Sequence, residues 1–390
     1  MRIFLVGGGS GGHITPTLAV ATKLKENLDK VCITYVVGKR DVLRNLVDGN
    51  NAIDKVVSIH SGKLRRYHGE GLKQLLDIPT VVLNIRDAFY IFAGIIESFF
   101  LLRRDRPDII FIKGGFVGVP VGLMAALLRI PYITHDSDAV PGLANRIISH
   151  WASAHAVAML KEVYDYPKAK TYQTGVPIAD EYSLVTKAKQ VYFKKQLGLD
   201  PHNPVLCVTG GGLGAQRLNE AVAQISNKLL ARHPQLHILH ITGKGKADEV
   251  KKIYQKMLGA KIVQVTIKEF VDNFYVYSGA SDVIVARAGA NSLAEFAAQA
   301  KACVIVPNPQ LTGGHQLKNA NILEESGAVI VVPDKAMQKN AELLLRPIDK
   351  LLADPSAREL LAKALNKTSN NDATGQLAKL ILDCVKKVSQ

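Results

Sequence analysis

The sequence predicts an α/β protein of two domains, each built on a largely parallel, doubly wound sheet. Apolar β-branched runs alternate with helical stretches along the whole chain, which is the pattern of repeated strand–helix units. A glycine-rich strand-to-helix junction stands in each half, at residues 7–13 and at residues 210–215. A length of 390 residues is sufficient for two hydrophobic cores.

Nine apolar runs are expected to form the strands: residues 3–6, 32–37, 109–112, 132–134, 205–209, 237–242, 261–265, 283–286 and 303–306. Between residues 171 and 190 the pattern changes to a short extended piece and a polar run, which is typical of a domain boundary. We therefore expect an N-terminal domain of residues 1–180 and a C-terminal domain of residues 181–364. After a break at residues 369–372, helical spacing resumes, and the helix within residues 365–390 is expected to pack back on the N-terminal domain.

The composition indicates a globular protein with anionic partners. The formal charge is +15, from 49 Lys and Arg against 34 Asp and Glu, which favours nucleic acid, phosphorylated substrates or an acidic lipid surface. No aromatic-basic recognition motif is apparent, so nucleic acid is not expected. The four cysteines lie far apart, which argues against a disulfide framework and a zinc site. Met1 leads directly into a strand rather than into a secretion signal, so we expect a cytoplasmic protein.

Both glycine junctions are typical of anion-binding turns, because glycine permits positive φ and the following helix presents free N–H groups. Both match the dinucleotide-binding pattern G-x-G-x-x-G/A, at Gly7, Gly9 and Gly12 and at Gly210, Gly212 and Ala215. The second predicted strand leads into Gly38-Lys39-Arg40 rather than into a ribose-binding acid, which argues against NAD. An NADP-dependent oxidoreductase remains an alternative.

Polar side chains follow the first glycine turn and the strand at residues 132–134. His13 lies one residue past the glycines, where it is expected to face the ligand as a base or a phosphate donor; the alternative is a capping or packing histidine. Asp136 and Asp138 follow the strand at its carboxyl end, where parallel sheets bind ligands. One of the two is equally suited to cap the next helix.

In the second half, residues 283–290 predict a strand, a bend and the start of a helix. Backbone N–H groups around Ala288 are expected to hold a diphosphate, and Glu295 in the helix to accept two ribose hydroxyls; a solvated helix position is the alternative for Glu295. Beyond the strand at residues 303–306, helical spacing allows two of His315, Gln316 and Asn319 to share one face.

Residues 78–102 are strongly apolar and are flanked by bases, from Lys63 to Lys73 before and from Arg103 to Arg106 after. Asn84, Arg86, Asp87 and Glu97 interrupt the run, so it does not predict a membrane-spanning helix. The helix itself is interpreted as a long core helix. The flanking bases favour an interfacial role for the region on an anionic membrane surface.

Five motifs, taken together, resemble the peptidoglycan N-acetylglucosaminyltransferases of glycosyltransferase family 28, which convert lipid I to lipid II. They are residues 7–13, 114–117, 210–215, 287–295 and 315–320, and they extend over nearly the whole chain. The resemblance implies a GT-B fold of two Rossmann-like domains facing a cleft, and peripheral attachment to the cytoplasmic face of the cell membrane. It also implies inverting transfer, without a metal or another cofactor, from UDP-N-acetylglucosamine to the C4 hydroxyl of a polyprenyl-diphosphate-linked muramyl peptide, as part of cell-wall synthesis, cell shape and cell division.

The resemblance also assigns roles to residues. In the C-terminal domain, the backbone at Phe270 and Val271 would meet uracil and Glu295 the ribose. The diphosphate would lie at Gly212, Arg287, Ala288 and Gly289, and the sugar or phosphates at Asn219, His315 and Gln316. In the N-terminal domain, the acceptor would be bound by His13 and by Gly9, Ser10, Gly11, Gly12, Thr15 and Phe116. His13 and Asp138 stand at strand ends and are the candidates for catalytic base. His13 is the first choice because a histidine is matched to neutral pH, and Asp138 is the second because an aspartate needs a raised pKa; Asp136 is a further catalytic candidate.

The chain departs from the family pattern at four places. His135-Asp136-Ser137-Asp138 stands where the family has His-Glu-Gln-Asn, and residues 175–179 lack the family's arginine, which is replaced by Ala179. Phe116 replaces a tyrosine, and Gly212-Leu213 replaces serine and glutamine. Two further alternatives are therefore retained: a glycosyltransferase of the same fold with another lipid or glycan acceptor, and a non-catalytic, membrane-surface nucleotide-binding protein.

Overall fold

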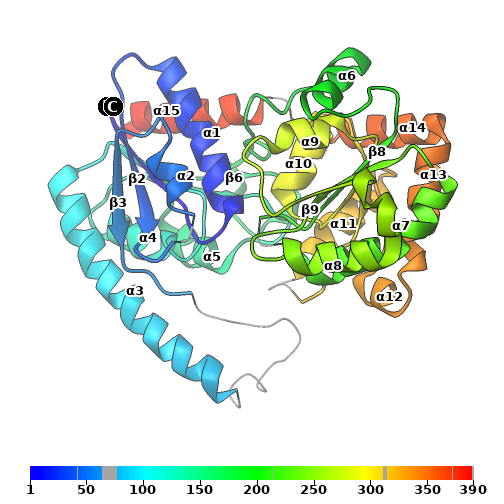
Figure 1. Ribbon diagram of the computed structural model, residues 1–390. Helices are drawn as coiled ribbons and strands as arrows, with labels where there is room; N and C mark the ends of the chain where they lie inside the picture. Colours follow the sequence, from blue (N-terminus) through cyan, green and yellow to red (C-terminus); the bar gives the residue numbers. More distant parts are fainter. Residues whose placement is uncertain (42, 64–76, 213, 311–313, 371, 389–390) are drawn as a thin grey trace. The chain divides into compact units, whose positions relative to one another are not determined.

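The computed structural model describes residues 1–41, 43–63, 77–212, 214–310, 314–370 and 372–388 (Figure 1). The chain divides into two compact units. Unit 1 comprises Met1–Asp180, Gln310–His315 and Asp372–Gln390, and unit 2 comprises Glu181–Pro309 and Gln316–Asn371. Each unit is an α/β structure around its own parallel sheet, so the predicted fold class is confirmed.

The sheet of unit 1 has the strand order β3-β2-β1-β4-β5-β6-β7. Its strands are β1 (Arg2–Val6), β2 (Cys32–Gly38), β3 (Lys55–Ile59), β4 (Ile109–Ile112), β5 (Tyr132–Asp136), β6 (Ala154–Val157) and β7 (Thr171–Gln173). All pairs are parallel. Because the strand order reverses between β1 and β4, the carboxyl ends of these two strands are where this topology binds ligands.

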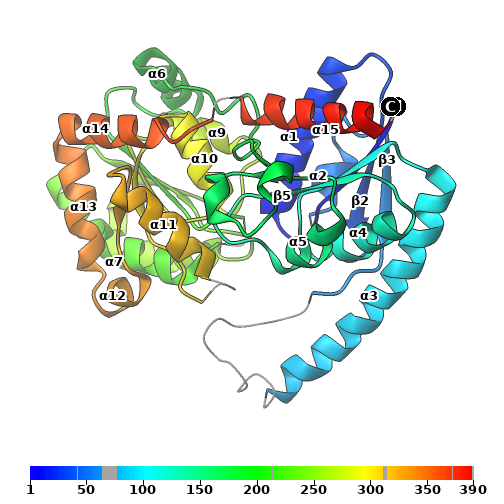
Figure 2. The same cartoon turned by 180° about the vertical axis from the view of Figure 1, so that it is seen from behind.

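Both faces of this sheet are covered, since successive side chains of a strand point to opposite faces. In β1, Ile3 and Leu5 pack with α1 and α15, and Phe4 and Val6 pack with α3 and α4. The helices are α1 (Gly11–Asn27), α2 (Asn45–Asp48), α3 (Ile78–Asp105), α4 (Gly118–Leu127), α5 (Leu143–Ile148) and α15 (Ala373–Val388). Figure 2 shows α15 beside α1, although the two are at opposite ends of the chain.

Unit 2 repeats the arrangement with the strand order β10-β9-β8-β11-β12-β13, all parallel. The strands are β8 (Val205–Thr209), β9 (His237–Ile241), β10 (Val265–Lys268), β11 (Val283–Ala286), β12 (Ala302–Ile305) and β13 (Ile330–Val331). The helices are α6 (Lys187–Gln196), α7 (Gln216–Arg232), α8 (Ala247–Leu258), α9 (Phe274–Ala280), α10 (Ala290–Ala298), α11 (His315–Glu325), α12 (Asp334–Lys339), α13 (Glu342–Ala353) and α14 (Pro355–Asn366). The switch point lies between β8 and β11.

Most predicted strands are present within a residue or two at their ends, and one is wrong. Residues 261–265 were expected to be extended, but Gly259–Gln264 forms a 3-10 turn and the strand begins at Val265. The strands β3, β6, β7 and β13 were not predicted. β7 and β13 have three and two residues, too few for a hydrophobic period to be apparent.

The core-helix interpretation of residues 78–102 is wrong for one face of α3. A row of large apolar side chains at helical spacing is between 45% and 72% exposed: Ile78, Val82, Ile85, Phe89, Phe92, Ile96 and Phe100. Two of the polar residues that interrupt the run lie on the inner side: Asp87 is buried, and Glu97 accepts hydrogen bonds from Lys39 Nζ and the His60 N–H, both at 2.6 Å. Arg86 is exposed. None of the described helices is long and apolar enough to cross a membrane.

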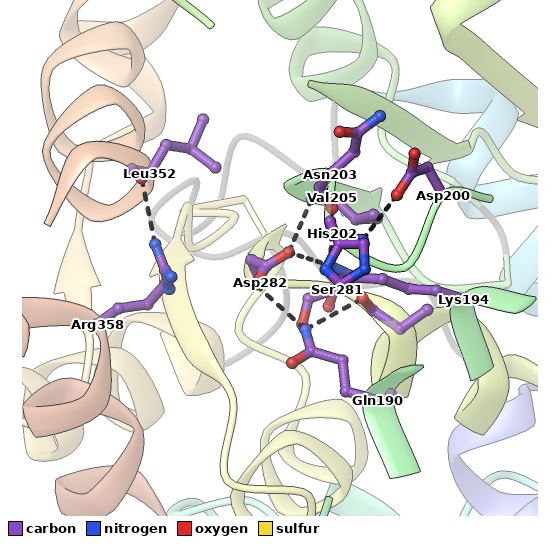
Figure 3. Close-up of polar contacts among 12 residues, drawn as sticks. Gln190, Lys194, Asp200, His202, Asn203, Val205, Ser281, Asp282, Leu352 and Arg358 are labelled. Atoms are coloured by element: carbon purple, nitrogen blue, oxygen red, sulfur yellow. Dashed lines mark hydrogen bonds and ion pairs between the residues drawn. The ribbon is translucent and has the colours of Figure 1, made fainter. Parts of the chain in front are cut away.

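A buried ion pair anchors α6 at the amino-terminal end of the unit 2 sheet (Figure 3). Lys194 Nζ donates to Asp282 Oδ2 at 2.9 Å and to Asn203 O at 2.7 Å. Asp282 also accepts hydrogen bonds from the Val205 N–H and from Gln190 Nε2. This carboxylate therefore connects the start of β8 and the strand β11 to the helix that opens the unit.

Replacement of Asp282 by alanine is expected to lower the free energy of unfolding of unit 2 by about 3 kcal/mol, because it leaves the buried Lys194 ammonium without its counter-charge. Urea unfolding followed by circular dichroism measures this change. Glu359→Ala, which removes an exposed pair with Lys363, is the matched control and is expected to cost less than about 1 kcal/mol. Equal losses in the two variants would contradict the anchoring role.

Candidate functional site

At the carboxyl end of β1, the turn into α1 requires glycine. Gly9 has φ +81°, and a Cβ there would lie 2.3 Å from Cε1 of Phe116. The Gly9 N–H donates to Asp41 Oδ2 at 2.7 Å, so a carboxylate occupies one amide of the turn. Ser10, Gly11, Gly12 and Thr15 surround the first turn of α1, where Ser10 is the N-cap without a side-chain capping bond. The turn thus brings the predicted glycine-loop residues and Phe116 together.

His13 occupies this turn as a neutral imidazole. Its ring packs against the β4–α4 turn: Cδ2 lies 3.2 Å from the position of a Cβ on Gly115, and Cε1 lies 3.6 Å from that of Gly114. Nδ1 is buried, and no described group hydrogen-bonds to it. Burial, and then the positive charge of Lys113, lower the pKa of His13 to about 3. The ring is therefore neutral in the free protein, where the low pKa makes it a weak proton acceptor.

Lys113 is a component of this site that the sequence analysis missed. It follows β4 directly, with its N–H on Val6 O of β1 at 2.9 Å, and is 3% exposed. Its Nζ donates to Ser137 Oγ at 2.8 Å. Burial lowers the pKa of Lys113 to about 8, although the negative charges of Asp138 and Asp136 oppose the shift. The available signal was its place at the end of a buried strand, immediately before two glycines.

Both carboxylate oxygens of Asp136, at the end of β5, accept hydrogen bonds. Its Oδ1 accepts hydrogen bonds from the Gly142 N–H and Asn145 Nδ2, and its Oδ2 accepts from Tyr166 OH. Burial raises the pKa of the carboxyl group in spite of these bonds. Asp136 therefore fixes the loop that follows β5. Its bond to Gly142, the N-cap residue of α5, favours a structural role of the kind expected for one of the two aspartates.

Asp138 is half-buried two residues further on. Its backbone carbonyl accepts a hydrogen bond from Tyr164 OH at 2.9 Å, and its charge acts on Lys113. His135, within β5, donates from Nε2 to Gly175 O at 2.9 Å. This hydrogen bond connects β5 to the chain that follows β7. His13, Lys113 and the β5 loop thus stand at three neighbouring strand ends.

The glycine turn of unit 2 follows β8 and is fixed by close backbone contacts. Gly214 has φ +70°, and a Cβ there would lie 2.1 Å from Thr242 O. Gly210 packs as tightly against Ala215. Gly212 is exposed and has open space around it. This turn is therefore rigid at both ends and accessible in the middle, as an anion-binding loop requires.

Asn219 lies beneath this turn, buried in hydrogen bonds. Its Nδ2 donates to Thr242 O at 2.9 Å and its Oδ1 accepts from His240 Nε2 at 3.1 Å. His240 in turn accepts from Tyr254 OH at Nδ1. Both ends of the Asn219 amide are thus used within the protein, which favours positioning of the turn over direct contact with a ligand.

Arg287, at the end of β11, is almost fully buried. Its Nη1 donates to Asp334 Oδ1 at 2.6 Å and to Val306 O at 3.0 Å, and its Nε has no described partner. Arg217, in the first turn of α7, donates to the other oxygen of Asp334 at 3.0 Å. One fully buried carboxylate therefore joins the residues that follow β8 and β11, the two strands at the switch point.

The remaining predicted donor residues of unit 2 surround these strand ends. Ala288 O accepts from Asn319 Nδ2 at 3.2 Å, and Gly289 is the N-cap of α10 with open space at its Cα. Gln316 Oε1 accepts from the Asn308 N–H at 2.9 Å. His315, the first residue of α11, is grouped with unit 1. The N-terminus of α10 is thus accessible beside Arg287, as expected for a diphosphate site.

Glu295 and Phe270 occupy the outer part of the unit 2 strand ends. Burial raises the pKa of Glu295 to about 8, and the Glu295 charge raises the pKa of Tyr182 further. Phe270, after β10, is 47% exposed, and Val271 follows it. A carboxyl group that burial keeps protonated near neutral pH both donates and accepts hydrogen bonds, so it is suited to the hydroxyl groups of a ribose.

Among the residues that the structure describes, no group of three or more His, Cys, Asp and Glu side chains is placed to hold a metal ion. In unit 1 the polar groups at the switch point are a neutral imidazole, an ammonium group and carboxylates. In unit 2 they are backbone amides, two guanidinium groups and a carboxylate. The two sites therefore differ in what they offer a ligand.

Comparison with known protein families gives two matches, one in each half of the chain. Residues 3–157 match the glycosyltransferase family 28 N-terminal domain, and residues 205–377 match the family 28 C-terminal domain. Over the whole fold, the structure of MurG from Acinetobacter baumannii superposes with a TM-score of 0.70 at 22% identity, covering 98% of this chain and 99% of that one.

Two curated relatives are similar over almost the full length. The UDP-N-acetylglucosamine--N-acetylmuramyl-(pentapeptide) pyrophosphoryl-undecaprenol N-acetylglucosamine transferase of Clostridium perfringens is 33% identical over 351 residues, 90% of each chain. The enzyme of the same name from Clostridium novyi is 32% identical over 381 residues, 97% of this chain and 98% of its own. Fold and sites together define a glycosyltransferase of the GT-B class. The chain belongs to glycosyltransferase family 28.

Proposed function

We propose that this chain transfers N-acetylglucosamine from UDP-N-acetylglucosamine to the C4 hydroxyl of lipid I, the undecaprenyl-diphosphate-linked muramyl pentapeptide, and so forms lipid II in peptidoglycan synthesis. The observation that carries the proposal is the similarity to relatives with this activity in their names, at 32–33% identity over at least 90% of both chains. The two switch-point sites support it, since one is rich in anion-binding amides and the other holds an unprotonated histidine.

In the proposed reaction the acceptor C4 oxygen attacks the anomeric carbon while the bond to the UDP oxygen breaks, with inversion of configuration. His13 accepts the hydroxyl proton at Nδ1, which has no described partner but is buried in the free protein, so acceptor binding must expose this nitrogen and raise its low pKa. Asp138 is the second candidate for this role, and Asp136 holds the loop that carries Asp138. UDP leaves as an anion.

Unit 2 stabilises the leaving diphosphate in this proposal. The N-terminus of α10 and the exposed Gly212 supply backbone hydrogen-bond donors, and Arg287 and Arg217 supply positive charge in the same unit. This preorganised set does the work that a divalent cation does in other transferases, so we propose metal-independent transfer. Glu295 binds the ribose, and the backbone at Phe270 and Val271 binds uracil.

We further propose that the protein is peripheral on the cytoplasmic face of the cell membrane, held there through α3. The exposed apolar row of α3 is the kind of surface that inserts among lipid headgroups, and Arg103 and Arg104 follow it at the end of the helix, both exposed. Arg40 and Arg86 lie over the Tyr90 ring at 4.7 and 5.6 Å from its centroid. The bases predicted at residues 65–73 lie outside the described residues.

The double substitution Phe89→Glu with Phe92→Glu is expected to weaken binding to vesicles that contain phosphatidylglycerol by at least about tenfold, because two exposed aromatic side chains no longer enter the bilayer surface. Vesicle co-sedimentation measures this binding. Val263→Glu with Leu360→Glu is the matched control, since both residues are similarly exposed in unit 2. Equal loss in the two double variants would exclude α3 as the membrane contact.

Calorimetric titration with UDP, UDP-N-acetylglucosamine and NADPH tests the donor assignment. The proposal predicts that UDP and UDP-N-acetylglucosamine compete for one site and that NADPH does not bind. Tight NADPH binding without UDP binding would favour the oxidoreductase alternative. Binding of UDP-N-acetylglucosamine without turnover of any lipid-linked acceptor would favour the non-catalytic alternative.

A further inference from the structure

The most unusual group that the mechanism leaves unused is the ammonium group of Lys113. A lysine is rarely this deeply buried without a close counter-charge, because burial of an isolated charge is costly. Lys113 nevertheless ends a core strand at 3% exposure. Its position is the carboxyl end of β4 beside β1, which is the switch point of the unit 1 sheet.

The hydrogen bonds of Lys113 leave donor capacity at this point. An ammonium group has three N–H donors. In the described part of the chain, the hydrogen bond of Nζ goes to Ser137 Oγ, which leaves two donors for another acceptor. The Asp136 carboxylate is already engaged by Gly142, Asn145 and Tyr166. A cation with open donors at a ligand-binding strand end is a site for an anion.

We propose that Lys113 binds the diphosphate of the lipid-linked acceptor in unit 1, as a specific phosphate contact that none of the five sequence motifs contains. This inference rests on the proposed function for the nature of the ligand. The Gly9 N–H is already bound to Asp41 Oδ2, so the turn after β1 contributes the N-terminus of α1 rather than the Gly9 amide. His13 packs against the glycines that follow Lys113, so an anchored diphosphate also places the acceptor near the proposed base.

The charge of Lys113 gives the binding a pH dependence. The titratable groups that face it are His13 on α1, His135 and Asp136 on β5, and Asp138 after β5. Burial and the charge of Lys113 hold both histidines neutral above pH 7. Since burial lowers the pKa of Lys113 to about 8, its charge, and with it diphosphate affinity, is expected to decline as pH rises from 7 to 9.5.

The experiment measures binding of inorganic pyrophosphate to the full chain by calorimetry, with UDP at saturation so that the donor site is occupied. Lys113→Met is expected to weaken pyrophosphate binding by about 10- to 100-fold at pH 7, the effect of losing a charge-assisted hydrogen bond. Lys113→Arg is expected to retain most of the affinity and to remove its decline toward pH 9.5, because a guanidinium group keeps its charge. Urea unfolding followed by the fluorescence of Trp151, which lies in unit 1 with Lys113, is the control for folding, and UDP affinity in unit 2 is expected to be the same in all three proteins.

Two results would overturn the inference: pyrophosphate affinity unchanged in a folded Lys113→Met variant, or affinity in a folded Lys113→Arg variant that is as weak as in Lys113→Met. The pH dependence of the unsubstituted protein is compared with that of Lys113→Arg, because pyrophosphate itself gains negative charge over this pH range. A chain that transfers sugar to lipid I but binds pyrophosphate independently of Lys113 refutes the inference alone. Binding that depends on Lys113 without transfer to lipid I supports the anion contact and refutes the proposed function.

Discussion

Replacement of His13 by alanine is expected to lower kcat for sugar transfer by about 100- to 10,000-fold, the range for loss of a general base. The reason is local. In the first turn of α1, the ring of His13 is neutral, and its buried Nδ1 has no described hydrogen-bond partner. UDP binding in unit 2 is expected to be unchanged, and urea unfolding followed by the fluorescence of Trp151 is the control for folding of unit 1. Steady-state transfer assays with the donor saturating measure the effect.

The pH profile gives the same prediction a second readout. A base must be unprotonated to act, and burial and Lys113 lower the pKa of His13 to about 3 in the free protein. Activity is therefore not expected to fall between pH 7.5 and 5.5 through protonation of His13. An acidic limb in kcat/KM near pH 6.5 that disappears in His13→Ala would contradict the buried, neutral state.

Asp138→Asn separates the two candidate bases. If His13 is the base, the asparagine variant is expected to keep kcat within about tenfold of the unsubstituted protein, since the amide retains the shape of the side chain. A larger loss in Asp138→Asn than in His13→Ala would transfer the role to Asp138. Near-normal turnover in both variants would show that neither residue is the base.

Replacement of Asp334 by alanine is expected to give the largest loss of stability, about 3 to 5 kcal/mol in unit 2, because it leaves two guanidinium groups without their shared carboxylate. Arg287 is the more affected, since it is buried and its Nε already lacks a described partner. UDP affinity is expected to fall as well, since Arg287 and the adjacent Ala288 and Gly289 lose their anchor.

Urea unfolding followed by circular dichroism is the suitable measurement for Asp334→Ala, because the single tryptophan, Trp151, lies in unit 1 and does not report on unit 2. Asp349→Ala is the matched control. Asp349 also binds two basic side chains, Arg232 and His233, but at the surface, so its loss is expected to cost about 1 kcal/mol or less. Similar losses in the two variants would show that the Arg287–Asp334–Arg217 group is not a structural unit.

The fold was predictable because its strongest signals are local. Buried parallel strands are continuous apolar runs, and glycine turns after β1 and β8 identify the ends that bind ligands. The short outer strands β7 and β13 could not be found, since two or three residues have no period. Strand β10 was displaced because the apolar residues of the preceding 3-10 turn have the composition of a strand.

The amphipathic character of α3 was visible in the sequence, but the direction of its faces was not. An apolar row on a helix predicts that this face is buried. Here the opposite face packs inward instead, where Asp87 is buried and Glu97 is bound by Lys39 and His60, residues far away in the sequence. The same reason explains Lys113 and Asp334. The role of each depends on a partner in another element, which is Ser137 for Lys113 and Arg287 for Asp334. Hydrophobic periodicity does not identify such partners.

The glycine-loop residues and His13 were predictable from the turn that contains them. The predicted contact of Asn219 with the sugar or phosphates stays a prediction, and its buried hydrogen bonds to His240 and Thr242 depend on β9 and could not be inferred from its own segment. Asp136 and Asp138 were indistinguishable in sequence. The three donors that converge on Asp136 separate them, and they come from residues up to thirty positions away.

The measurement that tests the central claim most directly is transfer of radiolabelled N-acetylglucosamine from its UDP derivative to purified lipid I, in the presence of a chelator and beside a panel of other lipid-linked acceptors. The account predicts labelled lipid II despite the chelator, and a β-linked product that shows inversion. Label on another acceptor and none on lipid I would contradict it, and would point to the Asp136-Ser137-Asp138 loop and Ala179 as the positions where this chain has changed its acceptor.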